Sequence, residues 1–128
     1  MPPKAWLAAQ LAGLVLLALL IRVPFFSVPM ITDEGGYAHW ASIWTSAHQP
    51  YRDFEFGRPQ ALLLVYKAAI AMFGGSVEAF RLTAALFNCL TTVGIFLFAR
   101  KLFTERAAVV SAVLYAVFST SPRIEGFT

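Results

Sequence analysis

Three long uncharged runs of apolar residues divide the chain. They cover residues 5–21, 82–99 and 107–121. A helix rises about 1.5 Å per residue, so roughly 17–25 apolar residues are needed to cross a bilayer. The pattern predicts an all-α polytopic membrane protein with about three transmembrane helices, at about residues 5–26, 77–101 and 105–121. The third run is near the shortest length that can span.

A cleaved signal peptide is the alternative interpretation of the first run. The apolar part of a signal peptide usually has about 7–15 residues and is followed by a cleavage site of small residues. Residues 5–21 are longer than this, and Ser27-Val28-Pro29 is a poor cleavage site. The sequence therefore favours an uncleaved anchor helix.

Small and polar residues between the runs predict where the helices begin and end. Gly74 and Gly75 interrupt the chain, and Ser76 can cap the helix that follows. Thr104 is placed to cap the third helix, and Pro122 ends it.

The distribution of cations predicts the orientation in the membrane. Lys4 precedes the first run, and Arg100, Lys101 and Arg106 crowd the turn between the second and third runs. Dense cations in short loops face the cytoplasm. We therefore expect a multi-pass protein of the plasma (inner) membrane with a cytoplasmic N-terminus. Residues 22–81, where cations and acids balance, then lie outside.

The outer loop, about residues 27–75, is predicted to contain juxtamembrane helices. Thr32 can cap a helix that starts at Asp33, and Tyr37, Trp40 and Trp44 then fall on the same side of it as Asp33.

A second juxtamembrane helix is expected from Pro59 to about Phe73. At about 22 Å it is too short to span. We expect it to lie along the membrane surface, with Lys67 extending to water.

The composition agrees with a membrane protein and excludes some functions. Hydrophobic residues make up 59% of the chain and charged residues only 13%, whereas soluble domains carry about 25% charged residues. The net charge of +3 is scattered without a basic stripe, so nucleic acid is not an expected partner. The single Cys89 cannot form an internal disulfide.

Polar side chains that could carry chemistry gather in the outer loop. The middles of the apolar runs contain no ionisable residue, and Asn88, Thr91 and Thr92 are expected to make helix contacts. The simpler interpretation is that the loop charges are helix-end acids and exposed ion pairs worth less than about 1 kcal/mol each. The candidates are Asp33, Glu34, His39, Arg52, Asp53, Glu55 and Arg58.

The order of short motifs between the apolar runs resembles a known family. The motifs are Asp33-Glu34-Gly35-Gly36-Tyr37-Ala38, Pro50-Tyr51-Arg52-Asp53-Phe54, Arg58-Pro59, Phe73-Gly74, Arg81-Leu82 and Ala99-Arg100-Lys101-Leu102-Phe103. Together they resemble the N-terminal part of the GT-C glycosyltransferases of the protein-mannosyltransferase and aminoarabinose-transferase type. One departure is Arg58-Pro59-Gln60, where the family commonly has Lys-Pro-Pro or Lys-Pro.

The resemblance implies an enzyme that moves a sugar from a polyprenyl-phosphate donor, a membrane lipid, to a glycan, lipid or protein acceptor on the outer side. Asp33 would be the base or would orient the acceptor, and Glu34 would support it. Arg58 would stabilise the phosphate, Asp53 would orient Arg58, and Tyr37 would lie beside Asp33. Some relatives use a divalent metal, although the sequence shows no recognisable ligand set and no cofactor is assigned.

Family members are longer and have more membrane spans. The chain is therefore expected to be a fragment that is inactive by itself. Two other classes remain open from the sequence. One is a small non-catalytic membrane protein or scaffold, and the other is the first part of a transporter, a class that usually has polar or broken helices at membrane depth.

Overall fold

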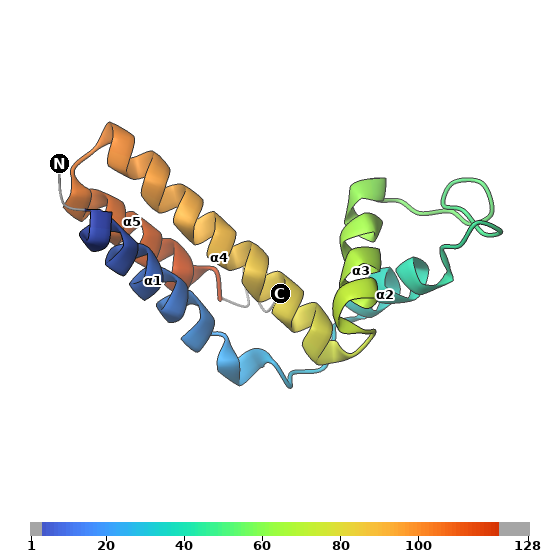
Figure 1. The fold of residues 1–128 in the computed structure, drawn as a ribbon. Coiled ribbons are helices and arrows are strands. Elements are labelled where there is room, and N and C mark those ends of the chain that lie inside the picture. The colour runs from blue at the N-terminus through green and yellow to red at the C-terminus, as the bar shows by residue number, and fades with distance from the viewer. Residues whose placement is uncertain (1–3, 121–128) are drawn as a thin grey trace. The chain divides into compact units, whose positions relative to one another are not determined.

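The structure is a computed structural model that describes residues 4–120. Every regular element in this range is a helix, which confirms the all-α fold (Figure 1). The elements are α1 (Lys4–Leu20), the 3-10 helix η1 (Val23–Phe25), α2 (Thr32–Ile43), α3 (Gln60–Phe73), α4 (Val77–Leu102) and α5 (Glu105–Phe118).

The chain folds into two compact units. The bundle unit contains α1, η1, α5 and α4 from Arg81 onward. The loop unit is residues 27–80, which contain α2, α3 and the first turn of α4. The division falls where the sequence changes from apolar runs to the mixed outer loop.

Two helical segments have the length and composition to cross a membrane. Lys4–Phe25 has 22 residues with a mean hydropathy of 2.1, and Val77–Leu102 has 26 residues with a mean hydropathy of 1.9. Only 17% and 28% of their most apolar windows are buried. A helix that is apolar all round and still exposed is suited to lipid rather than to a soluble core. The predicted first and second spans are therefore confirmed as apolar helices of sufficient length.

The third predicted span is shorter in the structure. Helix α5 has 14 residues and ends at Phe118. At about 1.5 Å per residue this is about 21 Å, less than the hydrocarbon thickness. A third crossing therefore stays a prediction, and its expected end at residue 121 and Pro122 lie outside the described residues.

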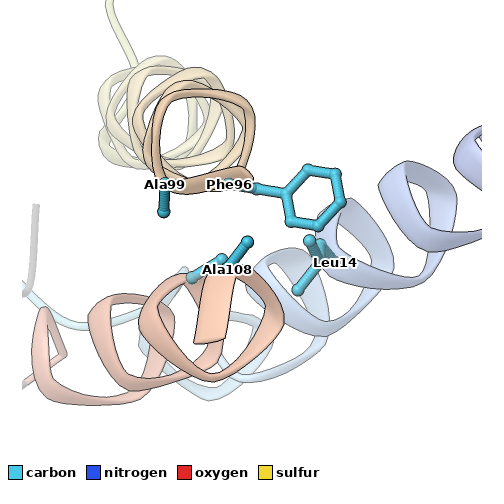
Figure 2. Packing of buried hydrophobic residues seen from close by; sticks show 5 residues of the cluster. Leu14, Phe96, Ala99 and Ala108 are labelled. Carbon is cyan, nitrogen blue, oxygen red and sulfur yellow. The ribbon is translucent and has the colours of Figure 1, made fainter. Parts of the chain in front are cut away.

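Small side chains bring the helices of the bundle unit together. Ala108, Ala112 and Ala116 recur every four residues along one side of α5 and are fully buried. Without a bulky side chain, neighbouring backbones can approach closely, which is how membrane helices gain packing contacts. Figure 2 shows Phe96 of α4 and Leu14 of α1 filling the space beside Ala108.

Polar residues inside the bundle unit bond to neighbouring helical turns or helices. The hydroxyl of Tyr115 donates to Asn88 Oδ1 at 3.0 Å, which links α5 to α4. Thr91 and Thr92 donate to the carbonyl oxygens of Phe87 and Asn88 in the preceding turn. The prediction that these residues make helix contacts is confirmed.

Arg22, which the sequence assigned to the outer segment, is buried within the bundle unit. Its side chain is only 5% exposed. One terminal nitrogen donates to the carbonyl oxygen of Ala18 at 2.9 Å, and the other donates to Ser119 Oγ. The guanidinium therefore joins the last turn of α1 to the residue after α5.

The residues that end and begin helices largely follow the prediction. Ser76 Oγ accepts the N–H of Ala79 at 3.2 Å, and Thr104 Oγ1 accepts the N–H of Ala107 at 3.3 Å. Gly74 ends α3 with a φ of 88°, a left-handed conformation that costs glycine little.

The predicted cap of α2 is wrong. Helix α2 begins at Thr32 itself, so Ile31 occupies the N-cap position and provides no side-chain acceptor. The carboxylate of Glu34 reaches back and accepts the N–H of Ile31 at 3.1 Å. This bond is one half of a capping box, and it lets the helix start one residue earlier than a threonine cap would allow.

Candidate functional site

The two acidic residues of α2 lie in different surroundings. Asp33 is exposed, whereas Glu34 is only 5% exposed. Successive residues of a helix point about 100° apart, so one carboxylate can face solvent while its neighbour packs inward. Both lie in the first turn of α2, where the helix dipole favours negative charge. Asp33 is therefore the more accessible of the two carboxylates.

Aromatic rings hold α2 against α3. Tyr37 meets the rings of Phe56 and Tyr66 edge to face, with centroid distances of 5.9 Å and 5.8 Å. Trp40 stacks on Phe54 at 4.9 Å. Such pairs contribute about 0.5–1.5 kcal/mol beyond the area they bury. The predicted aromatic side of α2 therefore faces the core of the loop unit, and Tyr37 fixes the turn that follows Asp33.

The buried centre beneath these rings is small. Ala41, Phe56 and Leu63 are almost fully buried and form the core of the loop unit. Tyr66, one turn after Leu63, extends the same side of α3. As a result, α2, the loop before Arg58 and α3 pack around one shared core.

The side chain of Lys67 contacts Trp44 inside the loop unit, a partner that the sequence did not predict. Its ammonium donates to the backbone oxygen of Trp44 at 2.6 Å and lies 4.7 Å from the centre of the Trp44 ring. Both contacts keep the charge within the loop unit, because a cation is attracted to a carbonyl oxygen and to an aromatic face. The position of α3 along a membrane surface, with Lys67 reaching water, stays a prediction.

Asp53 organises the loop before α3. Its carboxylate accepts the backbone N–H of Gln49 at 2.7 Å and the side-chain Nε–H of Arg52 at 3.2 Å. The bond from Gln49 holds the pKa of Asp53 below its ordinary value, and Arg52 lowers this pKa further. The expected pairing of Asp53 with Arg58 is not seen, because Arg52 takes that place.

Arg58 lies exposed at the end of the same loop. Its carbonyl oxygen accepts the hydroxyl of Tyr51, a residue with a φ of 65° that reverses the chain. Asp33 and Arg58 form no salt bridge with each other within residues 4–120. Both charged groups therefore remain accessible to ligands on the loop unit.

An open cavity of about 320 Å³ lies over this loop. Its walls carry both signs of charge beside aromatic rings, and it is open to solvent rather than enclosed, so we assign no ligand to it. The lining residues are Tyr51, Arg52, Asp53, Phe54 and Glu55.

The described residues contain no preformed cluster of metal-ligating side chains. Nowhere between residues 4 and 120 do three histidine, cysteine, aspartate or glutamate side chains come together. Divalent ions such as Mg²⁺ and Mn²⁺ prefer several oxygen ligands at one point.

The sequence did not predict the packing roles of several aromatic residues that shape the site. Phe54 and Phe56 alternate after the Pro50 turn, a spacing that places one ring on Trp40 and the other in the core. Tyr66 lies on the inner side of α3 between Leu63 and Ile70. The alternation of Phe54 and Phe56 and the helical spacing of Tyr66 were the available signals.

Comparison with known protein families assigns the chain to one of them. The family described as dolichyl-phosphate-mannose-protein mannosyltransferase matches residues 58–122, just over half of the chain. The chain belongs to this family. The match runs from Arg58 through α3, α4 and α5, so it covers α4 and α5 of the bundle unit but not α1. No curated protein and no solved structure gave a match.

The match confirms the family resemblance seen in the sequence and identifies a glycosyltransferase of the GT-C kind. Together with the apolar helices, it supports a membrane protein. The family implies a sugar donor and a glycan or protein acceptor in general terms. Asp33 and Glu34 precede the matched residues, so their roles stay predictions.

Proposed function

We propose that the chain takes part in transferring a sugar from a polyprenyl-phosphate donor to an acceptor hydroxyl at the outer membrane surface. The family match over residues 58–122 carries this proposal, because the family's description specifies dolichyl-phosphate-mannose, a sugar on a polyprenyl phosphate. A donor with a long apolar tail requires an enzyme embedded in the membrane, as the apolar α1 and α4 provide.

Asp33 is the base in this proposal. Its exposed carboxylate takes the proton of the acceptor hydroxyl while the hydroxyl oxygen bonds to the anomeric carbon of the sugar. The bond between that carbon and the phosphate oxygen breaks, and its electron pair leaves with the phosphate. Charge therefore moves from the acceptor side to the lipid phosphate.

Arg58 stabilises the departing lipid phosphate. Its guanidinium is exposed and has no salt-bridge partner among residues 4–120. A guanidinium can bind a phosphate through two parallel hydrogen bonds, which a lysine in the same place cannot do. Arginine at position 58, where the family commonly has lysine, therefore preserves the positive charge and makes the hydrogen bonds to phosphate more directional.

Glu34 and Tyr37 position Asp33. The carboxylate of Glu34 fixes the start of α2 through Ile31, and the ring of Tyr37 packs against Phe56 one turn later. Because Asp33 lies between Ile31, which bonds to Glu34, and Tyr37, its backbone is held in place before substrate binds.

The test for Asp33 is a transfer assay in native membranes that contain the protein, with a radiolabelled hexose on a polyprenyl phosphate. We expect Asp33→Asn to lower the transfer rate by about 100-fold or more, because amide nitrogen and oxygen cannot accept the proton. Glu55→Gln, which neutralises another exposed carboxylate of the loop unit, is the control and should keep the wild-type rate. An Asp33→Asn protein as fast as wild type would refute the proposed base.

The test for Arg58 is binding of a polyprenyl monophosphate to the purified chain in nanodiscs. Loss of a charge-assisted bond should weaken binding about tenfold in Arg58→Gln, with partial recovery in Arg58→Lys. Arg52→Gln removes a cation of the same loop that is paired with Asp53 and should leave binding unchanged. Equal effects of the Arg52 and Arg58 substitutions would contradict a specific role for Arg58.

A further inference from the structure

Four cations gather at one end of the bundle unit. Lys4 begins α1, Arg100 and Lys101 lie in the last turn of α4, and Arg106 lies in the first turn of α5. Figure 1 shows the start of α1, the end of α4 and the start of α5 at the same end of this unit. We call these four residues the basic end.

Hydrogen bonds between α1 and α5 fix the geometry of the basic end. The indole N–H of Trp6 and the amide of Gln10 both donate to Glu105 Oε1, at 2.7 Å and 2.6 Å. These bonds hold the first turns of the two helices side by side. The cations at positions 4 and 106 are therefore brought to the same end by the fold rather than by sequence proximity.

The cations of the basic end form no salt bridge within residues 4–120, although Arg100 lies near enough to Glu105 to interact with it electrostatically. Glu105 is the acid nearest to them in sequence, and its bonded oxygen is taken by Trp6 and Gln10. Within residues 4–120, no carboxylate oxygen lies within 4.0 Å of the charged nitrogens of the basic end. The positive charge is thus available to an external anion.

Exposed apolar side chains adjoin these cations. Trp6 is 53% exposed, Leu102 is 59% exposed and Phe103 is 68% exposed. Large apolar and aromatic side chains at a helix end are favoured at the boundary between acyl chains and headgroups. A ligand that fits both features has a negative headgroup joined to an apolar tail.

We propose that the basic end binds the headgroup of an anionic phospholipid. The phosphodiester accepts hydrogen bonds from the guanidinium groups of Arg100 and Arg106 and from the ammonium of Lys101. The acyl chains lie against Leu102. This lipid site is separate from the sugar-transfer site of the loop unit and does not depend on the proposed function.

The experiment is electron spin resonance on the purified chain in phosphatidylcholine bilayers, with spin-labelled phosphatidylglycerol or phosphatidylcholine as the probe. We expect the protein to immobilise phosphatidylglycerol preferentially and the preference to fall as salt is added. Lys101→Gln and Arg106→Gln should each reduce the preference about twofold to fivefold, the effect of removing one cation from an anionic surface.

Arg52→Gln is the matched control, because it removes one exposed cation from the loop unit. Circular dichroism checks that each variant keeps its helix content. Retention of the preference in Arg52→Gln, with its loss in the variants of the basic end, supports the proposal. Equal immobilisation of the two lipids, or an equal loss in Arg52→Gln, overturns it.

Discussion

At the scale of single residues, the adjacent carboxylates of α2 have separable roles. Glu34 is buried and bonds to the N–H of Ile31, whereas Asp33 faces outward. A buried group that satisfies the start of a helix contributes to folding, and an exposed one is free to meet a substrate. Stability and activity should therefore respond to different members of the pair.

We predict that Glu34→Ala lowers the free energy of unfolding of the loop unit by about 1–2 kcal/mol, because the N–H of Ile31 loses its acceptor. Faster hydrogen exchange at the start of α2 would measure this loss. Glu34→Gln keeps an oxygen acceptor and is the control, and it should retain most of the protection. If Asp33→Asn destabilised α2 as much as Glu34→Ala, the division of roles would be wrong.

Asp53 is expected to make the loop before α3 sensitive to acid. The pKa of its carboxylate is lowered in the folded chain, first by the N–H of Gln49 and then by Arg52. Its contribution to loop stability is therefore complete above the unfolded value of about 3.9 and is lost as pH falls through the lower folded pKa. Amide exchange at Gln49, corrected for the intrinsic pH dependence, should accelerate in that range. Asp53→Asn should abolish this pH dependence.

At the scale of helices, the alanine stripe of α5 determines how closely the helices of the bundle unit pack. Ala112 is fully buried, whereas Ser111 beside it is exposed. We predict that Ala112→Leu destabilises the unit by about 1–3 kcal/mol through overpacking. Ser111→Leu adds a similar volume on the outer side and should change stability by less than about 0.5 kcal/mol. Thermal unfolding in detergent measures both, and equal shifts would mean that α5 does not pack through this stripe.

Helix positions could be predicted from the sequence because their signals are local. The apolar runs, the glycine break at Gly74 and the caps at Ser76 and Thr104 all act within a few residues. The start of α2 was misplaced because two local signals competed, and the reach of Glu34 to Ile31 prevailed over a threonine cap.

Side-chain partners could not be predicted in the same way. The burial of Arg22 depends on Ser119, which is far away in the sequence, and Asp53 selects Arg52 and Gln49 over Arg58 through the turn at Tyr51. Tertiary packing determines the partner of Arg22, and the backbone turn at Tyr51 determines the partners of Asp53. The composition of the outer loop indicated the candidate residues without indicating which of them would meet.

At the scale of the whole molecule, two helices are long and apolar enough to cross a membrane. Together with the family assignment, they imply a membrane protein. The proposed chemistry then requires the loop unit to face the side where acceptor and lipid-linked donor meet. From the density of cations we predict that the turn between α4 and α5 faces the cytoplasm, which would put the loop unit on the outer side. The orientation and the proposed reaction can thus be tested independently.

We predict that an impermeant maleimide labels Ser46→Cys in intact cells and labels Phe103→Cys only after the membrane is opened. Ser46 is exposed in the loop unit, and Phe103 is 68% exposed between α4 and α5, so both thiols should be reactive wherever reagent can reach them. Cys89 is only 7% exposed and should give little background, which Cys89→Ala measures. The reverse labelling pattern would place the loop unit in the cytoplasm and would rule out sugar transfer on the outer side, while leaving the family assignment intact.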